Sequence, residues 1–194
     1  MGAASRPDPV RLIVGVLAAR AELLAEARRR LEQRYGPTDL ISAAMDFPFT
    51  HFYDAEMGGP PLRQLLSFER LIDPGELAAI KQWTNEVERV FAREFPISSG
   101  VTSQDGTTDV PLPRSVNLDP GYVTDWKLVL ATKRDRPHRV YLGGGIYGEV
   151  TLRHGQGRWT AQPWTYPDYA SGRYDDFLSQ ARELLLRAIE PKLH

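Results

Sequence analysis

Polar and charged side chains gather around turns rich in glycine and proline in the second half of the chain. A guanidinium such as that of Arg139 can hold a phosphate or carboxylate through two parallel hydrogen bonds. Glycines in a turn let backbone N–H groups approach a phosphate closely. Together these residue types predict a site for a small anionic ligand, such as a nucleotide or a phosphorylated metabolite. The residues expected to line it are Arg114, Asn117, Asp119, Tyr122, Lys127, His138, Arg139, Tyr141, Glu149, Tyr166 and Asp168.

The segment Gly143–Gly148 carries the spacing G-x-G-x-x-G. A dinucleotide-binding site needs a helix after this pattern, whereas the following residues Glu149–Leu152 are typical of a strand. The spacing of a phosphate-binding G-x-x-x-x-G-K loop is also present, but Glu149 stands where lysine would neutralise the phosphate. Two interpretations follow: a hairpin turn whose glycines adopt positive φ, and a hairpin that covers a phosphate.

Strand alternation divides the side chains of the two strands expected around this turn, His138–Leu142 and Gly148–Arg153. The residues expected to face the core are Val140, Leu142, Val150 and Leu152. The opposite face would carry Arg139, Tyr141, Glu149, Thr151 and Arg153. This polar face is either a solvent-exposed sheet surface with cross-strand ion pairs or the face on which Arg139 grips an anion.

Three further features have a functional and a structural interpretation. Asp119-Pro120-Gly121 is typical of a turn, in which Asn117 and Asp119 bond their own backbone or face a ligand. The segment Trp164–Tyr169 either seals a core edge, stacks a base or sugar, or docks a protein or RNA partner. His138 is a candidate acid or base because imidazole titrates near neutral pH. No histidine pair has metal-site spacing, so no metal is expected. No catalytic pair and no cofactor are identified, and an enzymatic role stays open.

Composition limits the class of protein. A chain of 194 residues fits one domain, expected over residues 8–194 with residues 1–7 frayed. The formal net charge of −1 lacks the basic excess of a non-specific nucleic-acid binder. The absence of cysteine excludes disulfides and thiolate catalysis. No apolar run approaches the roughly 18 residues of a membrane span, and the N-terminus lacks the apolar core of a signal peptide. We therefore expect a soluble cytoplasmic protein with no membrane association.

The apolar periodicity predicts an α+β fold: a single domain with a mostly antiparallel sheet and helices on one face. The order of elements in the first half predicts a ferredoxin-like βαββαβ unit. Its expected elements are a strand at Arg11–Ala18, a helix at Glu22–Tyr35, strands at Thr38–Ala44 and Arg63–Ile72, a helix from Pro74 to about Phe95, and a strand at Val116–Leu118. Asp73 can cap the second helix and Glu76 can close a capping box.

The second half reads as a β-meander followed by a final helix. Thr124–Lys133 fits either a short helix or a strand, and Arg158–Gln162 continues the meander after the two hairpin strands. The final helix is expected over about Tyr174–Ile189. Ser98–Pro113 is either a plain surface loop or a lid over a site.

Four blocks carry a family resemblance. They are VRLIVGVLAA at Val10–Ala19, LLSFERLIDPGELAAIKQWTNE at Leu65–Glu86, VNLDPGY at Val116–Tyr122, and GIYGEVTL at Gly145–Leu152 followed by PWTYPDY at Pro163–Tyr169. In these blocks the sequence resembles DUF4416, a bacterial and archaeal family whose chemistry is not assigned. Some of its members carry the automatic label "GTP-binding protein", so the resemblance implies nucleotide binding, although no standard GTP motif is present.

Overall fold

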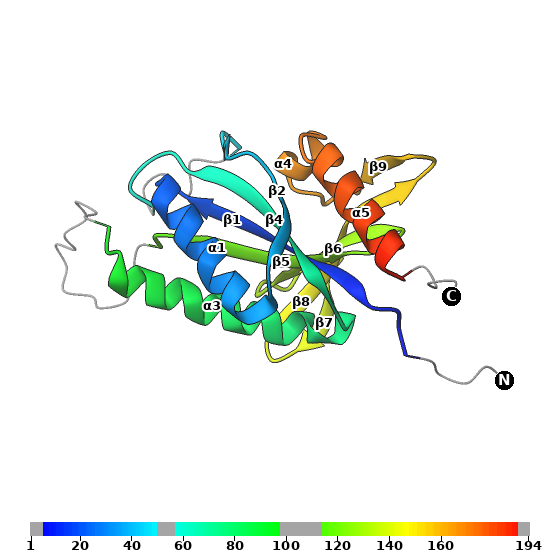
Figure 1. Ribbon diagram of the computed structural model, residues 1–194, viewed down its shortest axis with the longest axis horizontal. Helices are drawn as coiled ribbons and strands as arrows, with labels where there is room; N and C mark the ends of the chain where they lie inside the picture. The colour runs from blue at the N-terminus through cyan, green and yellow to red at the C-terminus, as the bar shows by residue number, and fades with distance from the viewer. Residues whose placement is uncertain (1–5, 50–56, 98–113, 190–194) are drawn as a thin grey trace.

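A computed structural model describes residues 6–49, 57–97 and 114–189 of the chain (Figure 1). Its strands are β1 (Val10–Ala18), β2 (Thr38–Ile41), β3 (Met45–Asp46), β4 (Leu62–Ile72), β5 (Asn117–Val123), β6 (Lys127–Thr132), β7 (Val140–Gly143), β8 (Ile146–Gly155) and β9 (Arg158–Ala161). Its helices are α1 (Ala21–Tyr35), α3 (Leu77–Glu94), α4 (Pro167–Ala170) and α5 (Asp175–Ile189), with a 3-10 turn at Pro74–Glu76 before α3.

The described strands form one antiparallel sheet in the order β2-β4-β1-β5-β6-β8-β7, with β3 paired to β4 and β9 to β8. The first half is the expected ferredoxin-like βαββαβ unit, because β1 lies between β4 and β5 while β2 flanks β4. All nine residues of β1 are buried, which explains its continuous apolar run. The predicted capping box is also present: Asp73 accepts from the Gly75 N–H at 2.7 Å, and Glu76 accepts from the Asp73 N–H at 3.1 Å.

Helices cover both faces of the sheet (Figure 1). Leu12, Val14 and Val16 of β1 pack with α1 and α3 on one face. Ile13 points to the other face, where it joins Phe177 of α5. The expectation of helices on one face therefore holds for α1 and α3, whereas α5 covers the opposite face.

The Gly-rich turn between β7 and β8 is a hairpin turn. Gly143, Gly144 and Gly145 have φ angles of 110°, 56° and 76°, which L side chains rarely adopt. The prediction that these glycines adopt positive φ is therefore confirmed.

The predicted division of side chains in this hairpin is wrong. Val140 is 68% exposed and Leu142 is 41% exposed, because β7 is the outermost strand of the sheet. Glu149 and Thr151 are buried instead of facing solvent. Where β8 pairs with β6, the register shifts by one residue at Thr151, since Val129 lies opposite Val150 but Leu128 lies opposite Leu152. Val150 and Leu152 consequently pack on opposite faces of the sheet.

The turn predicted at Asp119-Pro120-Gly121 is also wrong, because these residues lie within β5. Pairing between β5 and β6 begins only at Gly121, so Pro120 has a strand neighbour on one side, where it faces Val14 of β1. A strand that is locally an edge tolerates proline, because the missing N–H removes no ladder hydrogen bond. The true turn follows at Thr124, whose hydroxyl accepts the N–H of Trp126 and of Lys127 at 3.1 Å.

The ambiguous segment Thr124–Lys133 forms a strand, β6, from Lys127 to Thr132. The question whether Ser98–Pro113 is a loop or a lid concerns residues outside the described ranges, as does most of the N-terminus expected to be frayed. No helix in the described ranges is long and apolar enough to span a membrane.

Candidate functional site

The predicted site residues separate into two groups. The Asp119 cluster holds four of them, together with Tyr169 of the aromatic segment and three residues that the sequence did not single out. Its members are Arg63, Lys81, Glu88, Arg114, Asn117, Asp119, Asp168 and Tyr169. The Glu149 cluster consists of His138, Arg139, Glu149, Thr151 and Tyr166. Tyr122, Lys127 and Tyr141 lie outside both.

Arg63 crosses the central strand to reach Asp119. Gly15 of β1 lies opposite Asp119 of β5, and Arg63 of β4 extends over Gly15, where a Cβ would come within 2.5 Å of Nη2. Arg63 Nη1 donates to Asp119 Oδ2 at 2.9 Å, and Nη2 lies 3.0 Å from the Tyr169 hydroxyl. The arginine side chain is only 3% exposed. Glycine at position 15 therefore makes room for a buried guanidinium above the sheet.

Two charged side chains of α3 satisfy the open edge of β5. Glu88 Oε1 accepts the Leu118 N–H at 2.7 Å, and Lys81 Nζ donates to the Leu118 carbonyl at 2.6 Å. These groups replace the neighbouring strand that β5 lacks there. The Lys81 and Glu88 side chains are 6% and 5% exposed, and their charged atoms lie 3.9 Å apart.

Lys81 also joins the α3 side of the cluster to Asp119, because its Nζ lies 3.7 Å from Asp119 Oδ1. Asn117 Nδ2 donates to Asp119 Oδ2 at 2.8 Å, and Arg114 Nη1 donates to Asn117 Oδ1 at 3.0 Å. The Asp119 side chain is still 31% exposed. The cluster is therefore a continuous polar network that ends at a solvent-accessible carboxylate.

The carboxyl groups of this network differ in their tendency to ionise. The pKa of Asp119 is lowered overall, because the charges of Arg63 and Lys81 outweigh the opposing effect of burial. Burial raises the pKa of Glu88 in spite of Lys81, and it also raises the pKa of Asp168. Burial raises the pKa of Tyr169 to about 12, so this phenol stays protonated at neutral pH. The network therefore holds carboxyl groups whose pKa values are shifted in opposite directions.

A groove of about 490 Å³ opens between α3 and the β7–β8 turn. It is lined by Gln82, Trp83, Asn85, Glu86, Arg89, Lys133, Gly144, Gly145 and Ile146. Gln82 Nε2 donates to the Gly144 carbonyl at 2.9 Å and ties the turn to the helix. Asn85 is 8% exposed, and its Oδ1 has no hydrogen-bond partner among the described residues. This groove will be called the α3 groove.

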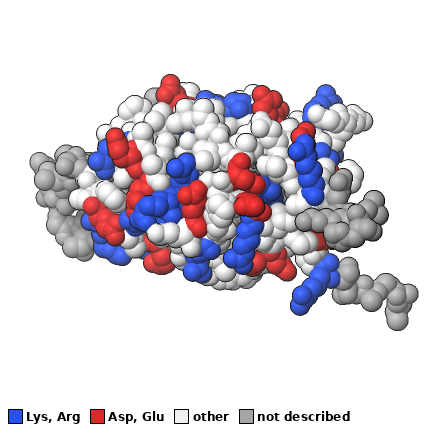
Figure 2. Space-filling view, viewed as in Figure 1, with Lys and Arg blue, Asp and Glu red and all other residues white. Residues whose placement is uncertain are grey.

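The α3 groove lies beside the Asp119 cluster. Burial lowers the pKa of Lys133 on the groove wall; Glu88 opposes this shift, whereas Lys81, Arg114 and Arg89 add to it by charge repulsion. These groups therefore lie within electrostatic range of one another. Around them, basic and acidic side chains alternate on the face that carries α1 and α3, so this face has no broad basic field (Figure 2). Any excess of positive charge is local.

The Glu149 cluster fixes the segment before α4 to the hairpin. Arg139 Nε donates to Glu149 Oε2 at 2.6 Å, and its Nη2 lies 3.1 Å from the Tyr166 hydroxyl. His138 Nε2 lies 3.2 Å from the same carboxylate oxygen, and its ring stacks on Trp164 at 5.0 Å. The Arg139 side chain is 4% exposed. Its donors are directed at protein acceptors rather than at a pocket.

The three other predicted residues have separate environments. Tyr122 packs against the apolar clusters on the α3 face. Lys127 begins β6 and lies opposite Arg153 of β8. Tyr141 is 59% exposed, contacts the Tyr147 ring, and accepts the Gly145 N–H at 3.3 Å. Within the described ranges, no three histidines or carboxylates gather as a metal site requires.

Sequence reasoning missed Arg63, Lys81, Glu88 and Lys133. Two signals in the sequence pointed to the first three. Gly15 interrupts a buried strand, which indicates that another group approaches the backbone closely. Lys81 and Glu88 lie on the buried side of α3 beside Ile80 and Val87, where a charged residue needs a polar partner.

Comparison with known proteins places the chain in a family. The sequence model described as "Domain of unknown function (DUF4416)" matches residues 8–185. The chain belongs to the DUF4416 family. No curated protein and no solved structure matches the chain. The blocks that carry the resemblance supply Gly15, Lys81, Asp119 and Glu149, so both clusters lie within the part of the chain that the family covers.

Proposed function

We propose that this DUF4416 protein binds a small anionic ligand, a nucleotide or a phosphorylated metabolite, in the α3 groove. The observation that carries the proposal is the gathering of Lys81, Arg89, Arg114 and Lys133 around Glu88 beside that groove. Since burial raises the pKa of Glu88, this carboxyl offsets the four cations less than an exposed carboxylate would. Arg89 already pairs with Glu86 and Lys81 with Asp119, so an anion in the groove would compete with these carboxylates for the cations.

The walls of the groove suit a phosphate group. Lys133 offers a charged donor, Arg89 offers the guanidinium nitrogens that do not bond Glu86, and Asn85 offers an amide whose oxygen has no partner among the described residues. Gly144 and Gly145 border the groove, where the Gly144 carbonyl accepts from Gln82 and the Gly145 N–H donates to the Tyr141 hydroxyl, so an anion would have to replace these bonds to reach the backbone. A volume of about 490 Å³ lies within the range of small-molecule sites.

The proposal differs from the sequence-based expectation in the residues that contact the anion. Arg139 was expected to grip the ligand, but its donors are directed at Glu149, Tyr166 and the Arg134 carbonyl. We therefore assign anion binding to Lys133 and Arg89, and the support of the hairpin to Arg139. We also propose that the protein acts in the bacterial or archaeal cytoplasm, as its composition and the family resemblance led us to expect.

The alternative is an interaction module that docks a protein or RNA partner through Trp164–Tyr169. The observation in its favour is that Trp164 and Tyr166 keep exposed fractions of 37% and 46%. We rank it second because the polar atoms of these rings already bond the Val150 carbonyl and Arg139. This segment therefore has an internal role that explains its aromatic residues.

Thermal unfolding of the purified protein with nucleotides and phosphorylated metabolites tests the proposal. A ligand at 100 times its Kd should stabilise the fold by roughly 2.7 kcal/mol. For a chain of this size that corresponds to an increase in Tm of about 5–10 °C. Lys133→Ala and Arg89→Ala should each abolish most of the shift, because each removes a cation from the groove wall.

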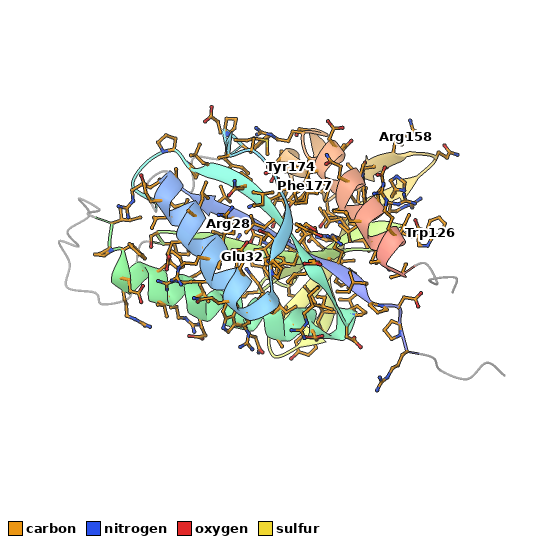
Figure 3. All side chains as sticks on the ribbon, viewed as in Figure 1. Arg28, Glu32, Trp126, Arg158, Tyr174 and Phe177 are labelled. Carbon is orange, nitrogen blue, oxygen red and sulfur yellow. The ribbon has the colours of Figure 1, made fainter. Side chains whose placement is uncertain are left out.

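Arg158→Ala is the matched control, because it removes an exposed cation from the β8–β9 hairpin, far from α3 (Figure 3). It should leave the shift unchanged. A flat response to the whole panel at millimolar concentrations would exclude these ligands and favour the interaction module. A shift that all three variants retain would mean that the ligand binds elsewhere.

A further inference from the structure

A second groove opens between α1 and α3, which lie side by side on one face of the sheet (Figure 1). It has a volume of about 430 Å³ and is lined by Arg30, Gln33, Arg34, Trp83 and Val87. This groove will be called the α1 groove. Trp83 lines the α3 groove as well, so one indole ring forms a wall of both grooves. A single ligand that passes over this ring can therefore contact both.

Trp83 is a partly exposed ring that is held from two directions. The Tyr35 ring meets it edge-on, with ring centroids 5.3 Å apart and planes at 89°. The Arg34 guanidinium carbon lies 5.3 Å from the centroid of the indole. The N–H of this indole forms no hydrogen bond with a described residue, whereas those of Trp159 and Trp164 bond protein acceptors. It is therefore available to a ligand or to water.

The other side chains of the α1 groove suit a planar ring rather than a second phosphate. Arg30 is already paired with two carboxylates. Arg34 forms no ion pair within the described ranges, and its guanidinium lies over the Trp83 ring. Gln33 is exposed and offers an amide, which can donate to and accept from the edge of a base. Proteins stack nucleobases on aromatic rings and on guanidinium planes, and this groove offers both.

We propose that the ligand of the α3 groove is a nucleotide, whose phosphate lies beside Lys133 and Arg89 and whose base stacks on Trp83 in the α1 groove. This inference rests on the proposed function, because it takes the phosphate to lie in the α3 groove. A nucleotide has the two parts that the two grooves suit, a phosphate and a planar base joined by a ribose. A phosphorylated sugar has no base and would leave the α1 groove unoccupied.

Ligands with and without a base provide the test. The first set is the 5′-monophosphates and 5′-triphosphates of the four common ribonucleosides, and the base-free set is ribose 5-phosphate and inorganic triphosphate. Isothermal titration calorimetry measures the Kd of each. Stacking of one base on an aromatic side chain corresponds to about 5- to 150-fold in Kd. At least one nucleotide should therefore bind tighter by about this factor than the base-free ligand with the same number of phosphates.

Two variants assign that difference to the α1 groove. Trp83→Leu should bring the Kd values of the nucleotide and the base-free ligand to within about twofold of each other, because leucine offers no ring for stacking. Trp126→Leu is the matched control, because Trp126 is 68% exposed and lies at the turn between β5 and β6; it should keep the full difference (Figure 3). Since Trp83 packs against the core, Arg34→Ala supplies a second variant at an exposed position. It should narrow the difference by about 2- to 5-fold.

The outcomes separate this inference from the proposed function. Equal affinities for ligands with and without a base, weakened by Lys133→Ala, would overturn the inference and leave the proposed function standing. A nucleotide preference that survives in both Trp83→Leu and Arg34→Ala would mean that the base lies elsewhere, and would overturn the inference as well. If no nucleotide and no base-free phosphate binds at millimolar concentration, the inference and the proposed function both fail.

Discussion

Replacement of Gly15 by alanine tests whether Arg63 is held across the central strand. A Cβ at position 15 would lie 2.5 Å from Arg63 Nη2 and 2.7 Å from Cζ. An exposed arginine would move away at little cost. Arg63 is 3% exposed and bonds both Asp119 and Tyr169, so it cannot move without breaking those contacts. Gly15→Ala should therefore disrupt the Asp119 cluster from a position that carries no polar group.

The expected loss of stability follows from two effects. Overpacking a buried site costs typically 1–3 kcal/mol, roughly the strain of inserting one methyl group. Complete separation of a buried ion pair costs about 3–5 kcal/mol. The Arg63–Asp119 pair would be displaced rather than removed, and Asp119 is 31% exposed, so water can replace part of the lost contact. We therefore expect a loss of about 3 kcal/mol, equivalent to roughly 6–12 °C in Tm.

A double-mutant cycle separates the contact with Arg63 from a general effect of alanine in a strand. In an Arg63→Met background the flexible thioether replaces the fixed guanidinium, so Gly15→Ala should cost less than about 1 kcal/mol there. The difference of about 2 kcal/mol is the coupling energy between the two positions. Urea unfolding followed by circular dichroism measures all four proteins. Equal costs of Gly15→Ala in both backgrounds would refute the placement of Arg63 over Gly15.

Three further predictions test the turn, the ionisation of the network and the hairpin support. Gly144 has a φ of 56°, so Gly144→Ala should lower the free energy of unfolding in urea by about 1–2 kcal/mol. Gly155→Ala is the control: its added Cβ meets nothing within 4 Å, so the loss should be under about 0.5 kcal/mol. Folding raises the pKa of Glu88, so its contribution to stability is present below the unfolded pKa and is lost as pH rises through the folded pKa. Glu88→Gln should therefore gain stability relative to the unmodified protein as pH rises above about 4, the pKa of a glutamate in the unfolded chain. Folding lowers the pKa of Asp119, so its contribution to stability is lost as pH falls through the folded pKa. The stability of Asp119→Asn relative to the unmodified protein should therefore fall as pH rises, opposite to Glu88→Gln. Parallel pH profiles of stability for these two variants would contradict both assignments. Glu149→Gln should cost about 3 kcal/mol in the same assay, because Arg139 would stay buried without a counter-ion.

The first half of the fold was predictable because its local signals agree with its tertiary contacts. The buried run of β1, the apolar stripe of α3 and the capping box at Asp73 each specify one element. Their order then leaves few sheet topologies, and the ferredoxin-like arrangement is one of them. The second half was harder, because a single register shift at Thr151 decides which face of the sheet each later side chain occupies.

The segment Asn117–Tyr122 shows how tertiary packing overrides a local turn signal. Asp-Pro-Gly favours a turn in isolation. In the fold, Gly121 packs closely against the Val129 carbonyl, where any Cβ would collide, so glycine is required for strand contact rather than for a turn. Pro120 lies where β5 has only one strand neighbour. Both residues therefore have a role in the strand that no short sequence window could reveal.

The candidate site was predictable only in its local parts. Arg114, Asn117 and Asp119 are close in sequence and do share one hydrogen-bond network. Arg63 lies 56 residues before Asp119, and Lys81 lies 37 residues before Leu118, the β5 residues that they bond. Only the pairing of strands and the packing of α3 bring these residues together. The sequence indicated these partners only indirectly, through Lys81 on the buried side of α3 and Gly15 within the buried strand β1.

The location of the α3 groove follows from the way this chain extends the ferredoxin-like sheet. In the βαββαβ unit β5 is an edge strand, and here β6 pairs with it only from Gly121 to Val123. The unpaired stretch of β5 takes its hydrogen bonds from Lys81 and Glu88 of α3, which brings two charges into the interior. β6 ends at Thr132, and the next residue, Lys133, lines the groove against α3. The incomplete pairing thus creates both the buried charges and the groove beside them, so the proposed site belongs to the junction between the common half of the fold and its extension.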